Sequence, residues 1–147
     1  MDQIKLTEQE MQLWLMYKET FKTVFARIVK DNYDKADISD GDYMVLDLLT
    51  RSENGQLRQQ ILADNMGWSK SRLSHHLVRM EKRGLIEKRP ITKGNGIQVV
   101  ITSKGTAAFE TVLPVSAAGI KRYFLDLLTE QDKEWIAGLA ARVKETL

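Results

Sequence analysis

Residues 68–97 read WSKSRLSHHLVRMEKRGLIEKRPITKGNGI, a basic segment in which the sequence period changes from helical to extended. The stretch holds eight Lys or Arg against two acids, whereas the formal net charge of the whole chain is only +2. A basic face on an otherwise mildly acidic protein is typical of nucleic-acid binding, because Lys and Arg neutralise the phosphates. The stretch therefore predicts a nucleic-acid-binding surface.

The first half of this stretch predicts a helix capped by Ser69, because a serine hydroxyl there satisfies a free amide of the first turn. Its inner face at helical spacing is Leu73, His76, Leu77 and Met80. After Gly84, two β-rich runs, 85–91 and 97–102, flank Lys93-Gly94-Asn95-Gly96, and Asn-Gly between such runs predicts a hairpin. A basic helix followed directly by a hairpin predicts a winged helix-turn-helix.

Two shorter helices are predicted before the basic helix. Ser39 and Asp42 form a capping box that starts one helix, which a turn at Asn54-Gly55 ends. The next helix is predicted over 56–66, with Gly67 just past its end, where a left-handed cap costs least. A short helix, a Gly-containing turn and a second helix form the helix-turn-helix pattern.

Long helices are predicted on both sides of this region. Thr7 and Glu10 form a capping box before an apolar face that extends to Val29, and the polar residues 31–37 are predicted to form a connection. A helix over 103–128 contains Pro114, which predicts a kink or a boundary there. Thr129 and Asp132 cap the last predicted helix.

Composition narrows the class of protein. A chain of 147 residues with 43% hydrophobic and 29% charged residues fits one soluble globular domain. The absence of Cys removes disulfides and thiolate sites, and the acids among the first twenty residues do not fit a signal peptide. We expect no membrane span and a cytoplasmic location.

Catalytic and metal-binding functions are not expected. His75 and His76 are adjacent on a helix, so their imidazoles point about 100° apart and do not readily share a metal ion. Ser71 and His75 lie one helical turn apart, but no oxyanion hole or third group accompanies them. We therefore predict a protein that is not an enzyme, with no catalytic residues, no metal and no cofactor. His76 is predicted to be a hydrogen-bonded, partly buried histidine.

The order of these elements resembles the MarR family of bacterial transcription regulators over essentially the whole chain. MEKRGLIEKRP at 80–90 is similar to the family's LEKRGLVERRP, ITSKG at 101–105 to its LTEKG, and LADNMG at 62–67 to its LAERLG. Two departures stand out: the wing tip is Lys93-Gly94-Asn95 where most members have an Asp-Arg pair, and His76 replaces a usually apolar residue.

The resemblance implies a mainly α fold with a small β-hairpin wing (α+β). Residues 39–102 would form the winged helix-turn-helix, and 1–36 and 103–147 the dimerisation helices. It also implies a homodimer that binds double-stranded DNA at a pseudo-palindromic operator, acts as a repressor, and is released by a small aromatic or anionic effector in a cleft beside the dimerisation helices. An alternative is a winged-helix interaction module or antirepressor that uses its basic face on an acidic partner protein.

Residue candidates follow from helix faces and from the way a recognition helix enters the major groove. The predicted DNA-binding residues are Lys70, Ser71, Arg72, Ser74, His75, Arg79, Arg89, Lys93 and Asn95. Lys82 and Arg83 are further candidates for phosphate contacts. The candidates for an effector cleft are Trp14, Tyr17, Phe21, Tyr43 and Met44, for which core and dimer packing is the alternative.

Overall fold

The computed structural model describes residues 4–147, which divide into two compact units. The helical unit contains the described residues up to Ile28 together with Ala117–Leu147. The winged-helix unit is Val29–Ser116. None of the helices formed by the described residues is long and apolar enough to cross a membrane.

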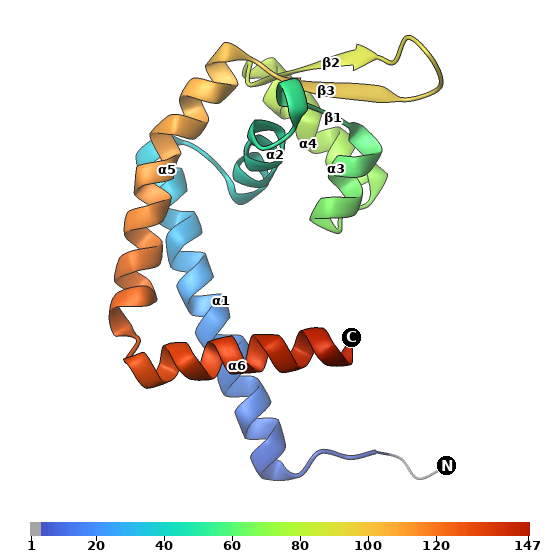
Figure 1. The fold of residues 1–147 in the computed structure, drawn as a ribbon. Helices are drawn as coiled ribbons and strands as arrows, with labels where there is room; N and C mark the ends of the chain where they lie inside the picture. Colours follow the sequence, from blue (N-terminus) through green and yellow to red (C-terminus); the bar gives the residue numbers. More distant parts are fainter. Residues whose placement is uncertain (1–3) are drawn as a thin grey trace. The chain divides into compact units, whose positions relative to one another are not determined.

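The winged-helix unit combines helices with one small antiparallel sheet, as the sequence predicted (Figure 1). The sheet has three strands in the order β1-β3-β2. In chain order the elements are the end of α1 (Glu8–Ala36), α2 (Asp40–Thr50), the 3₁₀ turn η1 (Glu53–Gly55), β1 (Gln56–Arg58), α3 (Gln59–Met66), α4 (Lys70–Lys82), β2 (Ile86–Pro90), β3 (Ile97–Ile101) and the start of α5 (Ser103–Tyr123).

The core of the winged-helix unit is formed where α2, α3 and α4 pack against the sheet and the start of α5. Leu46, Leu62 and Leu77, one from each of these helices, are completely buried. Val99 of β3 and Val112 of α5 join them and are equally inaccessible. Because each large buried aliphatic side chain contributes about 1.5–3 kcal/mol, this core holds α4 in a fixed position.

The turn between α3 and α4 has the predicted geometry. Gly67 follows α3 with φ 63°, a left-handed conformation that glycine adopts without the steric cost of a side chain. The hydroxyl of Ser69 then accepts a hydrogen bond from the backbone N–H of Arg72 at 3.2 Å and caps α4. The short turn fixes the direction in which α4 leaves α3.

The wing is the β2–β3 hairpin, with Ile86 opposite Ile101 and Pro90 opposite Ile97 (Figure 1). The third strand, β1, was not predicted, since the sequence analysis placed Gln56–Arg58 in a helix. That prediction was wrong because Leu57 pairs with Val99 of β3, and so distant a partner is not visible in a local pattern.

The base of the wing is joined to the first turn of α5. The Thr102 hydroxyl donates a hydrogen bond to the Gly84 carbonyl at 2.6 Å and accepts one from the Gly105 backbone N–H at 3.0 Å. A Cβ at Gly105 would lie 2.0 Å from the carbonyl oxygen of Leu85. Only glycine therefore allows α5 to begin this close to the hairpin.

The connection predicted at 31–37 was wrong for most of its length, because α1 continues to Ala36 and Asp31 and Asn32 are buried. Ion pairs one turn apart, from Lys30 to Asp34 and from Lys35 to Asp31, support this last part of the helix. The turn comes at Asp37, whose φ is 54°.

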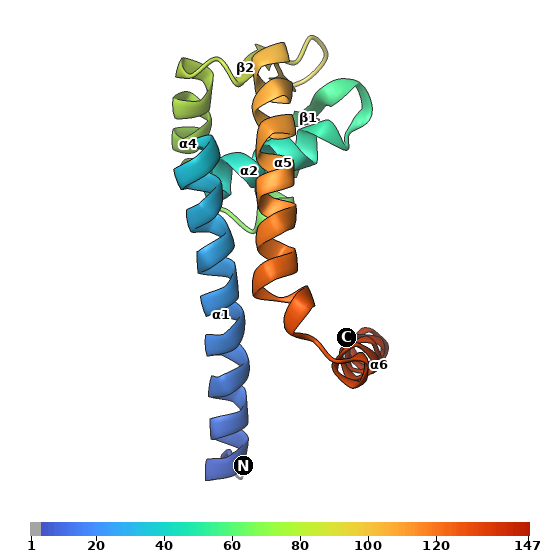
Figure 2. The same cartoon turned by 90° about the vertical axis from the view of Figure 1, so that its left-hand side faces the viewer.

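The helical unit contains most of α1, the end of α5, the 3₁₀ turn η2 (Leu125–Leu127) and α6 (Glu130–Thr146). The Thr7–Glu10 and Thr129–Asp132 capping boxes start α1 and α6 as predicted. Helix α5 runs through Pro114 without a break and ends at Tyr123, earlier than the predicted residue 128. In Figure 2 α6 is seen along its axis while α1 runs vertically, so the two helices are crossed.

Contacts inside the helical unit join α1 to the segment around the end of α5. The side chain of Arg27 donates a hydrogen bond to the Tyr123 hydroxyl at 3.3 Å, and the rings of Phe21 and Phe124 lie 5.8 Å apart. Among the described residues of this unit, no large apolar side chain is buried. The unit therefore leaves much of its apolar surface exposed.

Candidate nucleic-acid interface

Helix α4 turns its apolar face into the core and its polar face to solvent. Leu73, His76, Leu77 and Met80 are buried, as predicted from their spacing. Of the outward residues, Ser74 is half-buried. The other predicted contact residues of α4 are exposed: Lys70, Ser71, Arg72, His75 and Arg79.

The basic side chains of this region fall into two groups. Arg83, Lys88 and Arg89 each have a carboxylate partner, at 2.7, 3.5 and 2.8 Å respectively. In the part of the chain that the structure describes, no carboxylate lies within ion-pair distance of the others, namely Lys70, Arg72, Arg79, Lys82 and Lys93. Positive charge without an ion-pair partner is thus concentrated on α4 and at the wing tip, where it attracts phosphate.

Arg72 has a defined position despite its exposure. Its guanidinium carbon lies 3.8 Å from the centre of the Trp68 ring, a cation–π contact across one turn. Burial raises the pKa of the Asp40 carboxyl, and the charge of Arg72 lowers that pKa in part. Arg72 therefore interacts both with the charge of Asp40 on α2 and with the ring of Trp68.

A buried polar cluster lies behind α4. Asp42 accepts hydrogen bonds from Arg83 Nη1 at 2.7 Å and from the Ser39 backbone N–H at 3.1 Å, and its Oδ1 lies 3.0 Å from His76 Nε2. Burial alone would raise the pKa of Asp42, but its polar contact with His76 and its hydrogen bonds from Arg83 and Ser39 outweigh burial and hold that pKa well below its usual range. Asp42 is therefore a buried carboxylate that joins α2 to α4.

This cluster confirms the interpretation of His76 and changes that of Arg83. His76 is hydrogen-bonded and 8% exposed, which confirms the prediction of a partly buried histidine. Arg83 was grouped with phosphate contacts, but its guanidinium bonds to Asp42 and to the Asp37 carbonyl oxygen at 2.5 Å. The structure thus gives Arg83 an internal role.

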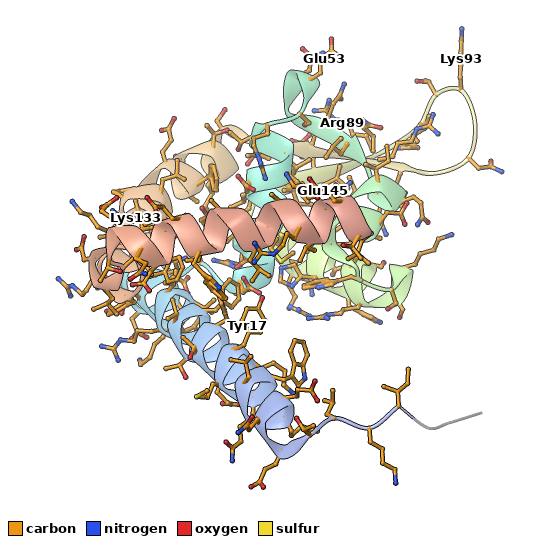
Figure 3. All side chains as sticks on the ribbon, turned by 60° about the horizontal axis from the view of Figure 1, so that its bottom comes forward. Tyr17, Glu53, Arg89, Lys93, Lys133 and Glu145 are labelled. Carbon is orange, nitrogen blue, oxygen red and sulfur yellow. The ribbon has the colours of Figure 1, made fainter. Side chains whose placement is uncertain are left out.

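The wing brings one predicted residue, Asn95, close to another, Lys70, which lies on α4. A groove of about 440 Å³ is lined by Lys70 of α4, by Asn95 of the wing loop and by the start of α3. Lys93 lies at the far end of the loop and points away from the hairpin, whereas Arg89 lies along it (Figure 3). The charge of Arg89 is shared with Glu87, so Lys93 is the freer cation of the two.

The candidates for an effector cleft separate into two sets. Trp14, Tyr17 and Phe21 form a row on α1, with ring centres 5.8 and 4.9 Å apart, and all three are exposed. Tyr43 and Met44 belong to the winged-helix unit and pack against its core, where Tyr43 meets the ring of Phe109 at 5.5 Å. Within residues 4–147, no group of three or more His, Asp or Glu is arranged to hold a metal ion.

Sequence reasoning missed Trp68, which was used only to mark where the basic stretch begins. Its position one helical turn before Arg72 is the signal that could have identified the stacked pair. The role of Gly41 was also missed, because it depends on packing between helices: a Cβ there would lie 2.7 Å from the Trp68 ring.

Two sequence comparisons with known proteins cover part of the chain. Residues 38–100 match the model of a domain of unknown function (DUF7343). An uncharacterised HTH-type transcriptional regulator of Bacillus cereus is 31% identical over 87 residues, which cover 59% of this chain and 58% of that protein. The matched region thus spans somewhat more than half the length of this relative.

Similarity to solved structures extends over nearly the whole chain. AbsC, a MarR family transcriptional regulator from Streptomyces coelicolor, superposes with a TM-score of 0.86 at 28% identity, covering 98% of this chain and 97% of AbsC. A second MarR family regulator from that organism, solved in complex with DNA, gives a TM-score of 0.87 at 23% identity and covers 99% and 92% of the two chains.

The fold and the exposed basic helix define a winged helix-turn-helix protein. Within that class the chain has the fold of the MarR family of transcriptional regulators, which confirms the resemblance seen in the sequence. Its relatives are named as transcriptional regulators, in agreement with the prediction that this chain is not an enzyme.

Proposed function

We propose that this chain is a cytoplasmic, sequence-specific transcription regulator that binds double-stranded DNA by placing α4 in the major groove. The observation that carries the proposal is the group of basic side chains without carboxylate partners on α4 and at the wing tip. The exposed residues in the first turns of α4 are in the position that meets base edges when a recognition helix docks. Lys82, Arg79 and Lys93 would contact phosphates and fix the register.

The proposed active form is a homodimer joined through the helical unit. Leu13, Met16 and Phe25 of α1 are 66%, 61% and 56% exposed, and Trp135 of α6 is 57% exposed. Apolar side chains exposed in such number are typical of an interface between subunits. A two-fold dimer would read a pseudo-palindromic operator with half-sites about 34 Å apart.

Repression and release complete the proposal. A dimer covering promoter DNA would repress, and an effector that binds better to a conformation unable to fit the operator would release it. The effector would be a small aromatic or anionic molecule, with either Trp14, Tyr17 and Phe21 of the helical unit or Tyr43 and Met44 of the winged-helix unit as candidate contacts. One structural neighbour, an organohalide-sensing regulator at 17% identity, was solved in a 2,4-dichlorophenol bound form.

The test is binding to fragments of the source genome at several salt concentrations. Affinity should fall steeply as salt rises, because bound Lys and Arg displace counterions. Arg72→Ala should weaken operator binding by about 1–3 kcal/mol and relax base preference at one position. Lys133→Ala is the matched control, since Lys133 lies on α6 and pairs with Glu130, and it should leave binding unchanged.

Two results would refute the proposal. One is the absence of salt-dependent binding to every fragment by the full-length protein. The other is an Arg72→Ala variant that binds all sites as well as the native chain does. Co-purification of an acidic protein in place of DNA would then favour the alternative of an interaction module, which the wing tip lacking arginine also allows.

A further inference from the structure

The feature that carries a further inference is the stack of Arg72 on Trp68. An exposed arginine on a helix ordinarily samples many rotamers, and binding must then freeze them. Here the guanidinium carbon lies 3.8 Å from the indole centre, and the backbone beneath it is fixed by the Ser69 cap. The structure thus places the guanidinium over the indole without any ligand.

Stacking leaves the hydrogen-bonding capacity of Arg72 free. A cation–π contact uses the face of the guanidinium, whereas its five N–H donors point outward in the plane of the group. The edge that recognises guanine O6 and N7 is therefore still available while the face rests on the indole. Arg72 can therefore contact the Trp68 ring and hydrogen-bond to a base at the same time. Trp68 can support Arg72 both in the free protein and in the complex with DNA.

The indole is itself held in place from α2 and α4. The Trp68 and His76 rings meet edge-on at 87°, with centres 5.4 Å apart. Gly41 lies against both: a Cβ there would come within 2.7 Å of Trp68 Cη2 and 2.8 Å of His76 Cε1. Only a residue without a side chain leaves room for this pair of rings.

The orientation of the His76 ring is fixed by its two nitrogens. Arg79 Nη2 lies 3.1 Å from Nδ1, and since a guanidinium has no acceptor, Nδ1 must accept and Nε2 must carry the hydrogen. Nε2 lies 3.0 Å from Asp42 Oδ1, a polar contact with the carboxylate that is not a well-aligned hydrogen bond. A chain of contacts thus runs from buried Asp42 through His76 and Trp68 to Arg72.

We propose that Trp68 is a positioning residue that determines DNA sequence specificity: its indole, wedged between His76 and Gly41, holds the Arg72 guanidinium in the orientation that reads a base pair. This inference rests on the proposed function. It assigns a role to a residue that does not itself read a base, and it makes base discrimination depend on packing behind α4.

The experiment uses the full-length protein. Selection from a random duplex library gives the preferred site, and affinities are then measured for that site and for each single base-pair change. Arg72→Ala identifies the base pair that Arg72 reads. At that pair Trp68→Leu should lower discrimination by about tenfold or more, whereas Trp68→Phe, which keeps an aromatic face, should retain most of it.

Three further variants separate positioning from general damage. Trp68→Leu combined with Arg72→Ala should discriminate no worse at that base pair than Arg72→Ala alone, because both act through one contact. Gly41→Ala should weaken discrimination at the same pair although Gly41 reads no base. Lys82→Ala, the control on α4, should weaken all sites uniformly and reduce the salt dependence. Each ratio is taken within one preparation, so an unfolded fraction cancels.

The inference is overturned if Trp68→Leu keeps the discrimination at the Arg72 base pair, loses it equally at every position, or adds fully to Arg72→Ala. These outcomes differ from failure of the proposed function, in which the native protein selects no sequence and shows no salt-dependent binding.

Discussion

Replacing Asp42 with asparagine should lower the free energy of unfolding by about 3 kcal/mol, because it removes the charge that pairs with buried or partly buried donors. Asp42 is 3% exposed and lies 2.7 Å from Arg83 Nη1 and 3.0 Å from His76 Nε2. Removing one partner of a buried ion pair costs about 3–5 kcal/mol. The Arg83 side chain is 38% exposed, so water can hydrate its charge once the carboxylate is removed. We therefore expect a loss at the lower end of the range of about 3–5 kcal/mol.

Urea unfolding followed by far-ultraviolet circular dichroism, at equal protein concentrations, measures this change. With a slope of about 2 kcal/mol per molar urea, the midpoint should fall by about 1.5 M. Asp47→Asn is the matched control on the same helix, since Asp47 pairs with the exposed Arg51 and such pairs contribute about 1 kcal/mol or less. Adding Arg83→Gln to Asp42→Asn should cost less than Arg83→Gln does alone, because the partner is already gone. A native-like midpoint for Asp42→Asn would refute this account of the cluster.

Three further predictions concern pH, packing and assembly. The stability difference between the native chain and Asp42→Asn should reach its full value above about pH 4, the pKa of this carboxyl in the unfolded chain, and should shrink as the pH falls. The reason is that the pKa of Asp42 is lower in the folded chain, so protonation in acid removes the stability that the charged carboxylate provides. A difference that grows in acid would contradict this prediction. Gly105→Ala should destabilise the protein by about 2 kcal/mol or more in urea unfolding, since its Cβ would lie 2.0 Å from the Leu85 carbonyl oxygen. The control Gly138→Ala places its Cβ near only the flexible Arg142 side chain and should be neutral or stabilising. Equal effects of the two substitutions would refute the close-approach argument. Trp135→Glu should shift the mass in solution from twice the chain mass of 16.9 kDa toward that mass, as measured by light scattering after gel filtration; an unchanged dimer would remove Trp135 from the interface.

Local signals in the sequence were sufficient to predict α4 and its boundaries. Ser69 and Gly67 act within one turn of the helices they cap, and the spacing of Leu73, Leu77 and Met80 alone identifies the inner face. The hairpin was equally predictable, because Asn95-Gly96 lies between two β-rich runs.

Features that depend on distant partners were not predictable in this way. Strand β1 exists because Leu57 finds Val99 across the sheet, and its three residues are too few to show a period of their own. At the polar end of α1, Asp31 and Asn32 are buried, although residues of these types are mostly exposed. The position of Arg72 over Trp68 depends in turn on Gly41, which lies on another helix.

The joint at Thr102 and Gly105 has a mechanical consequence. Since the first turn of α5 lies against the Leu85 carbonyl without an intervening side chain, a tilt of that turn would act directly on the base of the hairpin. Each strand is five residues long, about 16 Å at 3.3 Å per residue, so a tilt of about 10° at the joint would move the far end of the strands by about 3 Å. A small rotation at Gly105 would therefore be amplified along the wing, and the largest displacement would occur at its tip, where Lys93 lies.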